Sequence, residues 1–463
     1  MAVISSRAAV AVVCGMVVQL TALSGGAGGR SRSTEPLLLD TDVRGALGIS
    51  ADGLVEERFR VPEPVLAVLG GLEPGVSVHI RSWPVAPGDH RAIRLERRSV
   101  YAAGARLFEV GVHGLRELPR SPRIHFFGTI EDEADSGVLL VLDPRSGQLS
   151  GVTVSQGLSF DLEASDPAEP RAVRVVASHE RTAAHDPSWD CGGDRLESPD
   201  TPQYDSSTVP GRAVAKSGST LEAVVAIDTD TELLSQKFGN STAAAADYLA
   251  DLFAAMNVMY ERDLDLRLLQ GTTYLRTGSD PYVQNSGGSA SGAELDEFGN
   301  YWKTHYQAVD RALAAMLSGK SPSSNSASGI AWIGGLCSSS YGYSFSKVFK
   351  INYLSGDAKI VGHELGHNFG SPHTHCYSPP IDQCISQGGS CYSGPTSCPG
   401  GPGTVMSYCH LVGCGSTLNF HPTAVNRILG TYVAPATGVC VFAASQSGGG
   451  IFADGFENGM GGW

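Results

Sequence analysis

Residues 363–373 read His-Glu-Leu-Gly-His-Asn-Phe-Gly-Ser-Pro-His, and this stretch decides how the rest of the chain is interpreted. Residues four apart on an α-helix lie one turn apart on the same face, so His363 and His367 can present their imidazoles to one ion. Glu364 lies beside them but points elsewhere, where it can contact a water on the metal. The spacing therefore predicts a helix that carries two metal ligands and one acid–base group.

The residues after the second histidine extend this pattern. Gly370 can take the positive φ that ends a helix and reverses the chain, and Pro372 suits the non-helical stretch beyond it. His373 can then approach the same ion from the far side. Three neutral imidazoles leave the fourth position of a tetrahedral zinc site to water, which is the pattern of a catalytic zinc. In such a site zinc activates the water, and Glu364 takes its proton and later delivers it to a leaving amine.

The sequence around this motif has α/β order. Apolar runs and helical spacing predict three strands and three helices in the second part of the chain. The predicted strands are 223–227, 265–270 and 329–335, and the predicted helices are 241–262, 293–318 and 356–369.

Residues 30–190 are β-rich in pattern and contain no cluster of His, Cys or carboxylates with ligand spacing. Predicted strands there are 76–83, 124–130, 138–142 and 158–162. Residues 197–220 are polar and contain Pro, Ser and Gly, a composition typical of an exposed linker where nicking concentrates. The net charge of −14 and the lack of a Lys/Arg-rich block argue against a nucleic-acid partner.

Both ends of the chain carry segments outside the predicted fold. Arg7, the apolar run 8–23 and the small residues 24–27 predict a signal peptide over 1–27, since the apolar run is shorter than the ~20 residues of a membrane span. The mature protein is therefore expected to be exported and to have no membrane span. Residues 451–463 resemble a short tail found on exported proteins of some Gram-negative bacteria, which suggests a bacterial source; a disordered end is the alternative.

Cysteine usage agrees with export. Nine cysteines remain after Cys14 of the apolar segment is set aside, and six of them fall between 376 and 414. This density is expected of a disulfide-stapled region in an oxidising compartment. Because nine is odd, one thiol is left over.

These motifs give the chain a recognisable resemblance. The stretch HELGHNFGSPH, with GTVMSYC at 403–409 and GIAWIGGLC at 329–337, resembles the metzincin metallopeptidases, most of all the reprolysin/adamalysin (ADAM-type) family. The resemblance covers about 220–440. It implies that Met406 lies beneath the zinc in a Met-turn and that 329–337 is an edge strand on which a peptide substrate lies antiparallel. The residues expected to line that edge are Ile333, Gly334 and Gly335.

The resemblance also bears on the cysteines. It implies a Cys337–Cys440 disulfide and leaves the six cysteines between 376 and 414 to pair among themselves in an order that stays open. Cys191 is then alone. A thiolate is a good ligand for zinc, and metzincin zymogens often use such a cysteine to displace the catalytic water. FFGTIEDEADSGVLLVL at 126–142 loosely resembles the pro-region of the family, so Cys191 is expected to be a zinc-blocking thiol; an inert or disulfide-bonded Cys191 is the alternative.

Two further side chains near the motif have open roles. Tyr408, two residues after Met406, is either an oxyanion helper or simply packed. His375 is expected to be a loop histidine, because a fourth protein ligand would close the water site. No motif supports a calcium ion.

The predicted molecule is a secreted, monomeric zinc endopeptidase of α/β (α+β) metzincin-like class, with a twisted mixed sheet, long helices and a disulfide-rich C-terminal subdomain. Its predicted parts are a signal peptide (1–27), a β-rich inhibitory propeptide with linker (28–215), a one-zinc peptidase domain acting on proteins or peptides (216–442) and a Gly/Ser linker with tail (443–463). The alternatives are a secreted binding or adhesion protein on an inactive metallopeptidase fold, and a zinc amidase acting on cell-wall peptides. The presence of His363, Glu364, His367 and His373 favours the enzyme.

Overall fold

The computed structural model describes residues 37–39, 43, 45–50, 53–166, 168–178, 190–192, 196, 220–320, 328–348, 350 and 353–444. The predicted signal peptide lies outside these residues, as do 197–219 of the predicted linker and 445–463 of the predicted tail. We call the described residues up to 196 the N-terminal half and those from 220 the C-terminal half. Within the described residues, no helix is both long and apolar enough to cross a membrane.

Ten strands of the N-terminal half form one sheet, in which all neighbours are antiparallel except β1 and β4. In order across the sheet they are β1 (Leu37–Leu39), β4 (Ser77–Ala86), β5 (Asp89–Arg98), β8 (Ile124–Ile130), β9 (Gly137–Asp143), β10 (Gln148–Ser155), β11 (Leu158–Ala164), β12 (Ala172–Ala177), β3 (Val55–Arg60) and β2 (Ala46–Ile49). The sheet buries a core that includes Trp83 and Phe126. A short helix that the sequence did not predict, α1 (Glu63–Gly71), starts after Pro62 and adds Val65 and Leu69 to that core.

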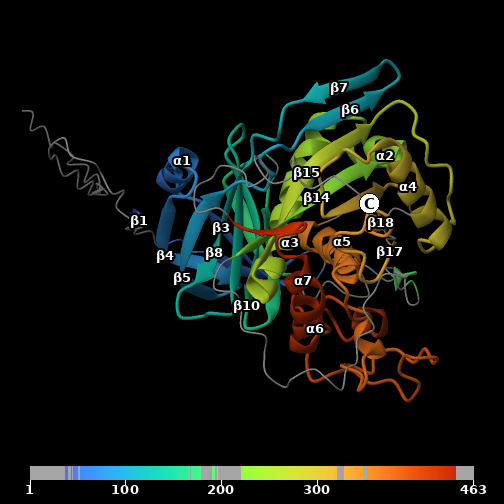
Figure 1. The fold of residues 1–463 in the computed structure, drawn as a ribbon. Coiled ribbons are helices and arrows are strands. Elements are labelled where there is room, and N and C mark those ends of the chain that lie inside the picture. The colour runs from blue at the N-terminus through green and yellow to red at the C-terminus, as the bar shows by residue number, and fades with distance from the viewer. Residues whose placement is uncertain are drawn as a thin grey trace, which may run out of the picture. The chain divides into compact units, whose positions relative to one another are not determined.

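A second sheet contains the predicted strands of the C-terminal half. In order across the sheet its strands are β13 (Asp190–Cys191), β17 (Ser328–Ala331), β18 (Tyr343–Lys347), β16 (Leu313–Ser318), β14 (Leu221–Thr229), β15 (Leu266–Arg276), β6 (Leu107–Gly111) and β7 (Gly114–Leu118), while β19 (Val441–Ala443) pairs with β14. The strands from β18 to β15 are parallel, and β17 is antiparallel to β18. Both outermost positions are filled by the N-terminal half, and Figure 1 shows the β6–β7 hairpin beside β15.

The helices belong mostly to the C-terminal half. They are α2 (Thr231–Phe238), α3 (Thr242–Leu264), α4 (Gly292–His305), α5 (Leu354–Asn368), α6 (Pro422–Arg427) and α7 (Ala434–Ala436), with 3-10 turns η3 (Thr374–Cys376) and η4 (Cys409–Val412) and a π-helix η5 (Ile428–Val433). Ser241 caps the start of α3 by accepting a hydrogen bond from the amide of Ala244, and Asp265 ends it in a left-handed conformation. Nearly every residue of α3 from Ala245 to Tyr260 is buried, because the helix contacts strands of both sheets.

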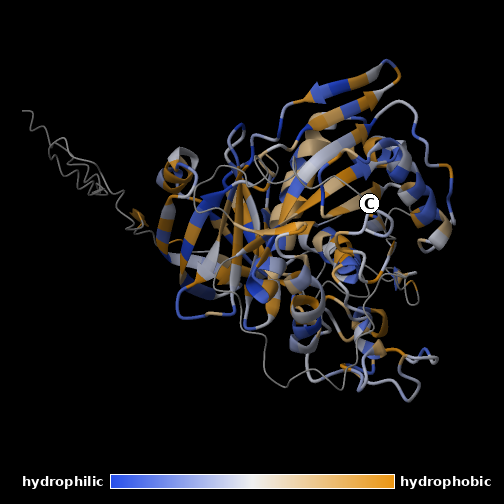
Figure 2. Cartoon of the chain, in the orientation of Figure 1, coloured by the Kyte–Doolittle hydropathy of each residue, from blue (hydrophilic) through white to orange (hydrophobic). Residues whose placement is uncertain are grey.

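The predicted helix over 293–318 is wrong in its second part. The helix ends at His305, and Leu313–Ser318 is the strand β16, buried along its whole length. A parallel strand that is covered on both faces has a continuous apolar run instead of an alternating one. Leu313 and Leu317 of this strand, with Val309 in the bend before it, therefore matched helical spacing by chance. The β6–β7 hairpin differs in this respect, since hydrophilic and hydrophobic bands alternate along it (Figure 2).

Candidate functional site

His363 and His367 lie one turn apart on α5, as predicted, and neither is accessible to solvent. Small residues allow the helix to pack closely enough to bury them. A Cβ at Gly362 would overlap with the end of the Met259 side chain, and one at Gly366 would lie 2.6 Å from Sδ of Met406. Gly362 and Gly366 therefore allow α5 to pack closely against Met259 and Met406.

The turn after α5 brings His373 back to the same place. Gly370 has a φ of 95°, and its amide donates to the carbonyl of His367 at 2.7 Å. A side chain there would also overlap with the ring of Tyr432. Glycine is required for both reasons, and the chain reversal that it allows places His373 against the two helix histidines.

Three ring nitrogens meet at this point. Nε2 of His373 lies 3.1 Å from Nε2 of both His363 and His367. The Nδ1 atoms of the two helix histidines each lie 2.7 Å from a carbonyl oxygen, that of Val405 for His363 and that of Ser371 for His367. A carbonyl only accepts, so Nδ1 carries the hydrogen in both rings and Nε2 presents a lone pair.

Lone pairs that face one another without a hydrogen between them are stabilised by a cation. Burial lowers the pKa of His363 and of His373 well below the usual range, and the neighbouring His367 adds to the effect, so these rings are neutral. Two nitrogens that bind one tetrahedral zinc at about 2.0 Å each lie about 3.3 Å apart, close to the spacing here. The donor set therefore fits a zinc ion, with carbonyl partners on the outer nitrogens of the kind that orient metal-bound histidines.

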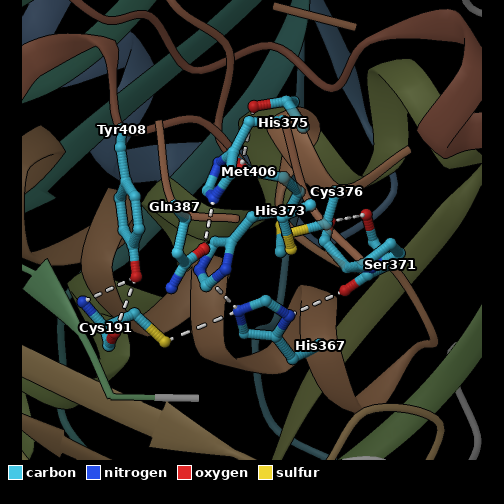
Figure 3. The surroundings of a disulfide bond; sticks show 12 residues. Cys191, His367, Ser371, His373, His375, Cys376, Gln387, Met406 and Tyr408 are labelled. Carbon is cyan, nitrogen blue, oxygen red and sulfur yellow. Dashed lines mark hydrogen bonds between the residues drawn. A yellow bond between two sulfur atoms is a disulfide. The ribbon is translucent and has the colours of Figure 1, made fainter. Parts of the chain in front are cut away.

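Cys191 lies against these histidines, although it is 172 residues before the first of them in sequence. It is buried, forms none of the disulfides, and its Sγ lies 3.5 Å from Nε2 of His367. One potential ligand atom from each of Cys191, His363, His367 and His373 falls within 4.8 Å of all the others. Figure 3 shows the thiol aimed at His367 from the short strand β13. The odd cysteine count left one thiol without a disulfide partner. In the structure the cysteine outside the disulfides is Cys191, and it lies beside the three histidines.

Tyr408 holds the backbone of the same cysteine. Its hydroxyl donates to the carbonyl of Cys191 at 2.6 Å and accepts from the amide of Cys191 at 3.3 Å (Figure 3). Its ring packs on His373, with 4.3 Å between ring centroids. The sequence left Tyr408 as either packed or a helper; in this structure it both packs on a histidine and binds the segment at the site.

Glu364 is also inaccessible to solvent, and its Oε2 lies 3.4 Å from Sγ of Cys191. A Cβ at Gly329 of β17 would overlap with the Glu364 carboxylate. Gly329 is therefore needed for the carboxylate to sit where it does, and sequence reasoning missed it. The only available signal was a glycine at the start of an otherwise apolar strand.

Met406 and His375 complete the surroundings. Met406 is buried against α5, where its Sδ lies beside Gly366; its expected place in a Met-turn beneath the zinc stays a prediction. His375 is buried in the 3-10 turn η3, and its Nε2 lies 2.7 Å from Oε1 of Gln387. It groups with His373 and Cys376 as potential metal ligands, but Cys376 is in a disulfide.

Four disulfides staple the C-terminal half. Cys337 pairs with Cys440, as the resemblance implied. The six cysteines between 376 and 414 pair among themselves as expected, and the structure supplies the order: Cys376–Cys391, Cys384–Cys409 and Cys398–Cys414. The second of these bonds anchors the residue next to Tyr408, so the loop that carries Tyr408 is tied down.

The predicted edge strand, 329–335, is shorter than expected. β17 ends at Ala331, so Gly334 and Gly335 lie in the turn that follows. The amide of Gly334 donates to the carbonyl of His367 at 2.8 Å, and Gly334 has a positive φ of 74°. The amide of Ile333 donates to the carbonyl of Leu196. The glycines therefore turn the chain onto α5 instead of extending the strand.

Part of the chain matches a model of a known protein family. Residues 220–419 match the family model Reprolysin_5, described as metallo-peptidase family M12. No curated protein sequence matches the chain. Among solved structures it is similar to metalloproteinase-II from Bacteroides fragilis, at 10% identity and a TM-score of 0.36, over 80% of this chain and 95% of that one. A chaperone–substrate complex is similar over 49% of this chain and 31% of that one, at 9% identity and a TM-score of 0.25. Residues 220–419, which are less than half of the chain, therefore resemble the M12 metallo-peptidases, and this match confirms the predicted resemblance to reprolysins.

Proposed function

We propose that the chain is a secreted zinc endopeptidase of metzincin type, made as a zymogen in which residues 28–215 inhibit a catalytic domain at 216–442. The observation that carries this proposal is the convergence of three histidine Nε2 atoms, 3.1 Å apart in two pairs, inside an M12-family segment. The M12 family implies zinc. The four disulfides are compatible with export to an oxidising compartment after removal of residues 1–27.

In the proposed site, His363, His367 and His373 hold the ion. When bound, zinc polarises a substrate carbonyl and lowers the pKa of a water toward ~7. Glu364 accepts the proton of the attacking water and passes it to the leaving amine. Two observations support this role: the carboxylate points into the space that the histidine nitrogens face, and Gly329 keeps that space open.

The substrate backbone is proposed to lie along β17. That edge already binds a segment of the N-terminal half, because β13 pairs with β17 and the amide of Gly192 donates to the carbonyl of Gly329 at 2.8 Å. The pairing is parallel, whereas the family resemblance implies an antiparallel substrate. A segment bound in the reverse direction presents its carbonyls with the wrong polarity, so it would occupy the edge without being cut.

Cys191 is proposed to block the zinc in the uncut chain. Replacing it with serine removes the soft ligand while leaving the strand pairing of β13 intact. We expect the uncut C191S chain to cleave a fluorogenic peptide at least about tenfold faster than the uncut wild type. A loss of ~1.4 kcal/mol in the free energy with which the N-terminal segment binds the site gives that factor. The doubly substituted C191S/E364Q chain is the control and should be inactive. An unchanged rate for C191S would mean that the thiol is not the block.

The activity itself is tested with matured protein and casein or a peptide substrate. We expect cleavage inside the peptide, its loss when a chelator removes the metal, and its return when zinc is added back. Matured protein that binds zinc but cuts neither substrate would instead indicate a binding or adhesion protein on this fold.

A further inference from the structure

A loop between β15 and α4 lies beside β17, the strand along which we propose that the substrate binds. We call residues 285–290 the overhang loop. The amide of Ala290 in this loop donates to Oγ of Ser328, the first residue of β17, at 2.5 Å. The Ser328 side chain is buried. The overhang loop is therefore attached to the start of the proposed substrate strand.

Buried charges hold the overhang loop in place. Nζ of Lys347, at the end of β18, donates to Oγ of Ser286 at 2.8 Å and to the carbonyl of Gly288 at 2.9 Å. The same nitrogen forms an ion pair with Oε1 of Glu294 at 3.0 Å, and both side chains are at most 1% exposed. Although burial raises it, hydrogen bonds from Lys347 and from two backbone amides hold the pKa of Glu294 below its usual range. Because breaking a buried ion pair is strongly unfavourable, the pair resists displacement of the loop.

The segment that pairs with β17 in this structure shows which side chains meet the overhang loop. In β13, Cys191 pairs with Gly329, and its thiol faces the histidines. Successive side chains of a strand alternate between its two faces, so the neighbours of Cys191 face the overhang loop instead. On one side of Cys191, Asp190 accepts a hydrogen bond at Oδ2 from Oγ of Ser289 at 2.6 Å. On the other side is Gly192.

The overhang loop leaves no room for a side chain at Gly192. A Cβ there would lie 2.2 Å from the carbonyl oxygen of Ala290 and 3.4 Å from Cδ1 of Ile330. The closer of these contacts is with the backbone of the anchored loop, which cannot turn aside as the end of a long side chain can. The position opposite Ile330 on this edge therefore has space for a hydrogen atom but not for a methyl group.

The same restriction applies to a substrate that lies antiparallel to β17. Residues that pair across a sheet place their side chains on the same face of it. A Cβ at Gly329 would point at the Glu364 carboxylate, so a substrate residue opposite Gly329 faces the site. The substrate residues opposite Ile330 and Ser328 then face the overhang loop. From its N-terminus to its C-terminus, an antiparallel substrate passes Ile330 first, then Gly329 and then Ser328.

We propose that the overhang loop determines the sequence specificity of the peptidase. The carbonyl of Ala290 selects glycine opposite Ile330, and the hydroxyl of Ser289 favours a hydrogen-bond acceptor such as aspartate opposite Ser328. The proposal rests on the proposed function and on its antiparallel substrate. The loop anchors Lys347 and Glu294 belong to the C-terminal half, so they remain in the matured protein. Preferred substrates then contain glycine, any residue that faces the site, and aspartate, in that order.

The first test is the cleavage of a peptide library by matured protein, with the products identified by mass spectrometry. We expect glycine to be enriched within the two residues before the cut, and aspartate to be enriched two residues after that glycine. Three peptides with the central sequence Gly-Leu-Asp, Ala-Leu-Asp or Gly-Leu-Ala then measure each preference. Alanine for glycine adds one methyl group and should lower kcat/KM by about 10–200-fold. Alanine for aspartate removes one hydrogen bond and should lower it by about three- to tenfold. Equal kcat/KM values for the three peptides would overturn the proposal.

Two serine variants assign these preferences to the overhang loop. S328A removes the hydroxyl that holds Ala290, so the ratio of kcat/KM for the glycine peptide to that for the alanine peptide should fall at least about threefold. Its control is S344A, a buried serine of β18 whose hydroxyl has no hydrogen-bond partner among the described residues. S289A should lose the preference for aspartate and keep that for glycine, whereas the exposed S235A of α2 should keep both. Both peptides of a ratio are measured on one sample, so a loss of folded protein does not change it. Wild-type ratios in S328A and S289A would contradict the assigned loop.

A binding measurement separates this proposal from the proposed function. Matured E364Q protein loaded with zinc is titrated with the three peptides, and fluorescence anisotropy should show the Gly-Leu-Asp peptide binding about 10–200-fold more tightly than Ala-Leu-Asp. This preference in binding, without cleavage by protein that keeps Glu364, would refute the peptidase and leave the overhang loop as a selective peptide-binding element. Equal cleavage and equal binding of the two peptides would refute the role of the loop and leave the peptidase standing. A failure to bind or cut any of the peptides would refute both.

Discussion

Replacing Glu364 with glutamine is expected to lower the rate of peptide cleavage by about 10²–10⁴-fold, the usual contribution of a positioned acid–base group. Glutamine has the same shape as glutamate, so it fits the space that Gly329 leaves for the carboxylate. The amide cannot accept the proton of an attacking water. The measurement is the turnover of a fluorogenic peptide by matured protein, with zinc content determined by atomic absorption on the same sample.

The zinc content is what makes this substitution informative. The histidine nitrogens keep their carbonyl partners in the variant, so we expect its zinc content to match that of the wild type. D296N, which changes an exposed acid of α4 to its amide, is the control and should be fully active. A Glu364 variant that loaded zinc and cut at the wild-type rate would remove Glu364 from the mechanism.

Replacing Gly370 with alanine is expected to destabilise the folded protein strongly, for two reasons. The positive φ of 95° strains any side chain, at about 1–3 kcal/mol. The new Cβ would overlap with the ring of Tyr432, and overpacking of this kind costs about 1–3 kcal/mol more. We therefore expect the free energy of unfolding to fall by about 2–6 kcal/mol, as measured by urea denaturation of the matured protein.

Zinc binding should weaken in the same variant, because the turn at Gly370 is what brings His373 to the other two histidines. Competition with a chromogenic chelator would measure this. G438A is a matched control, since Gly438 has a φ of 83° and no atom within 4 Å of the added Cβ. It should show the strain alone and normal zinc affinity. If the two variants were equally stable and bound zinc equally well, the contact with Tyr432 would not be important.

Features set by local sequence were predictable. The helix that carries His363 and His367 follows from their spacing, and the turn at Gly370 follows from the freedom of glycine. The odd cysteine count indicated one thiol outside the disulfides, and the family resemblance correctly identified it as Cys191. For the helix and the turn, the chemistry of the residues themselves limited the options.

Features set by packing were not predictable. β16 was taken for helix because burial on both faces removes the alternation that identifies a strand. The β6–β7 hairpin was not among the predicted strands, and its place in the second sheet depends on pairing with β15, which is distant in sequence. Gly329 was missed for the same reason, since its importance comes from α5, which contacts β17 only in the folded chain.

The location of the disulfides has a consequence for how the molecule would respond to dilution. In the uncut chain, the half that we propose to block the site is tethered at an effective concentration on the order of millimolar, whatever the protein concentration. Once the linker is cut, no covalent bond among the described residues maintains that value, because all four disulfides lie on one side of the cut. The blocked fraction then follows mass action. Cut protein would stay inactive at high concentration and become active on dilution, without any further chemical change.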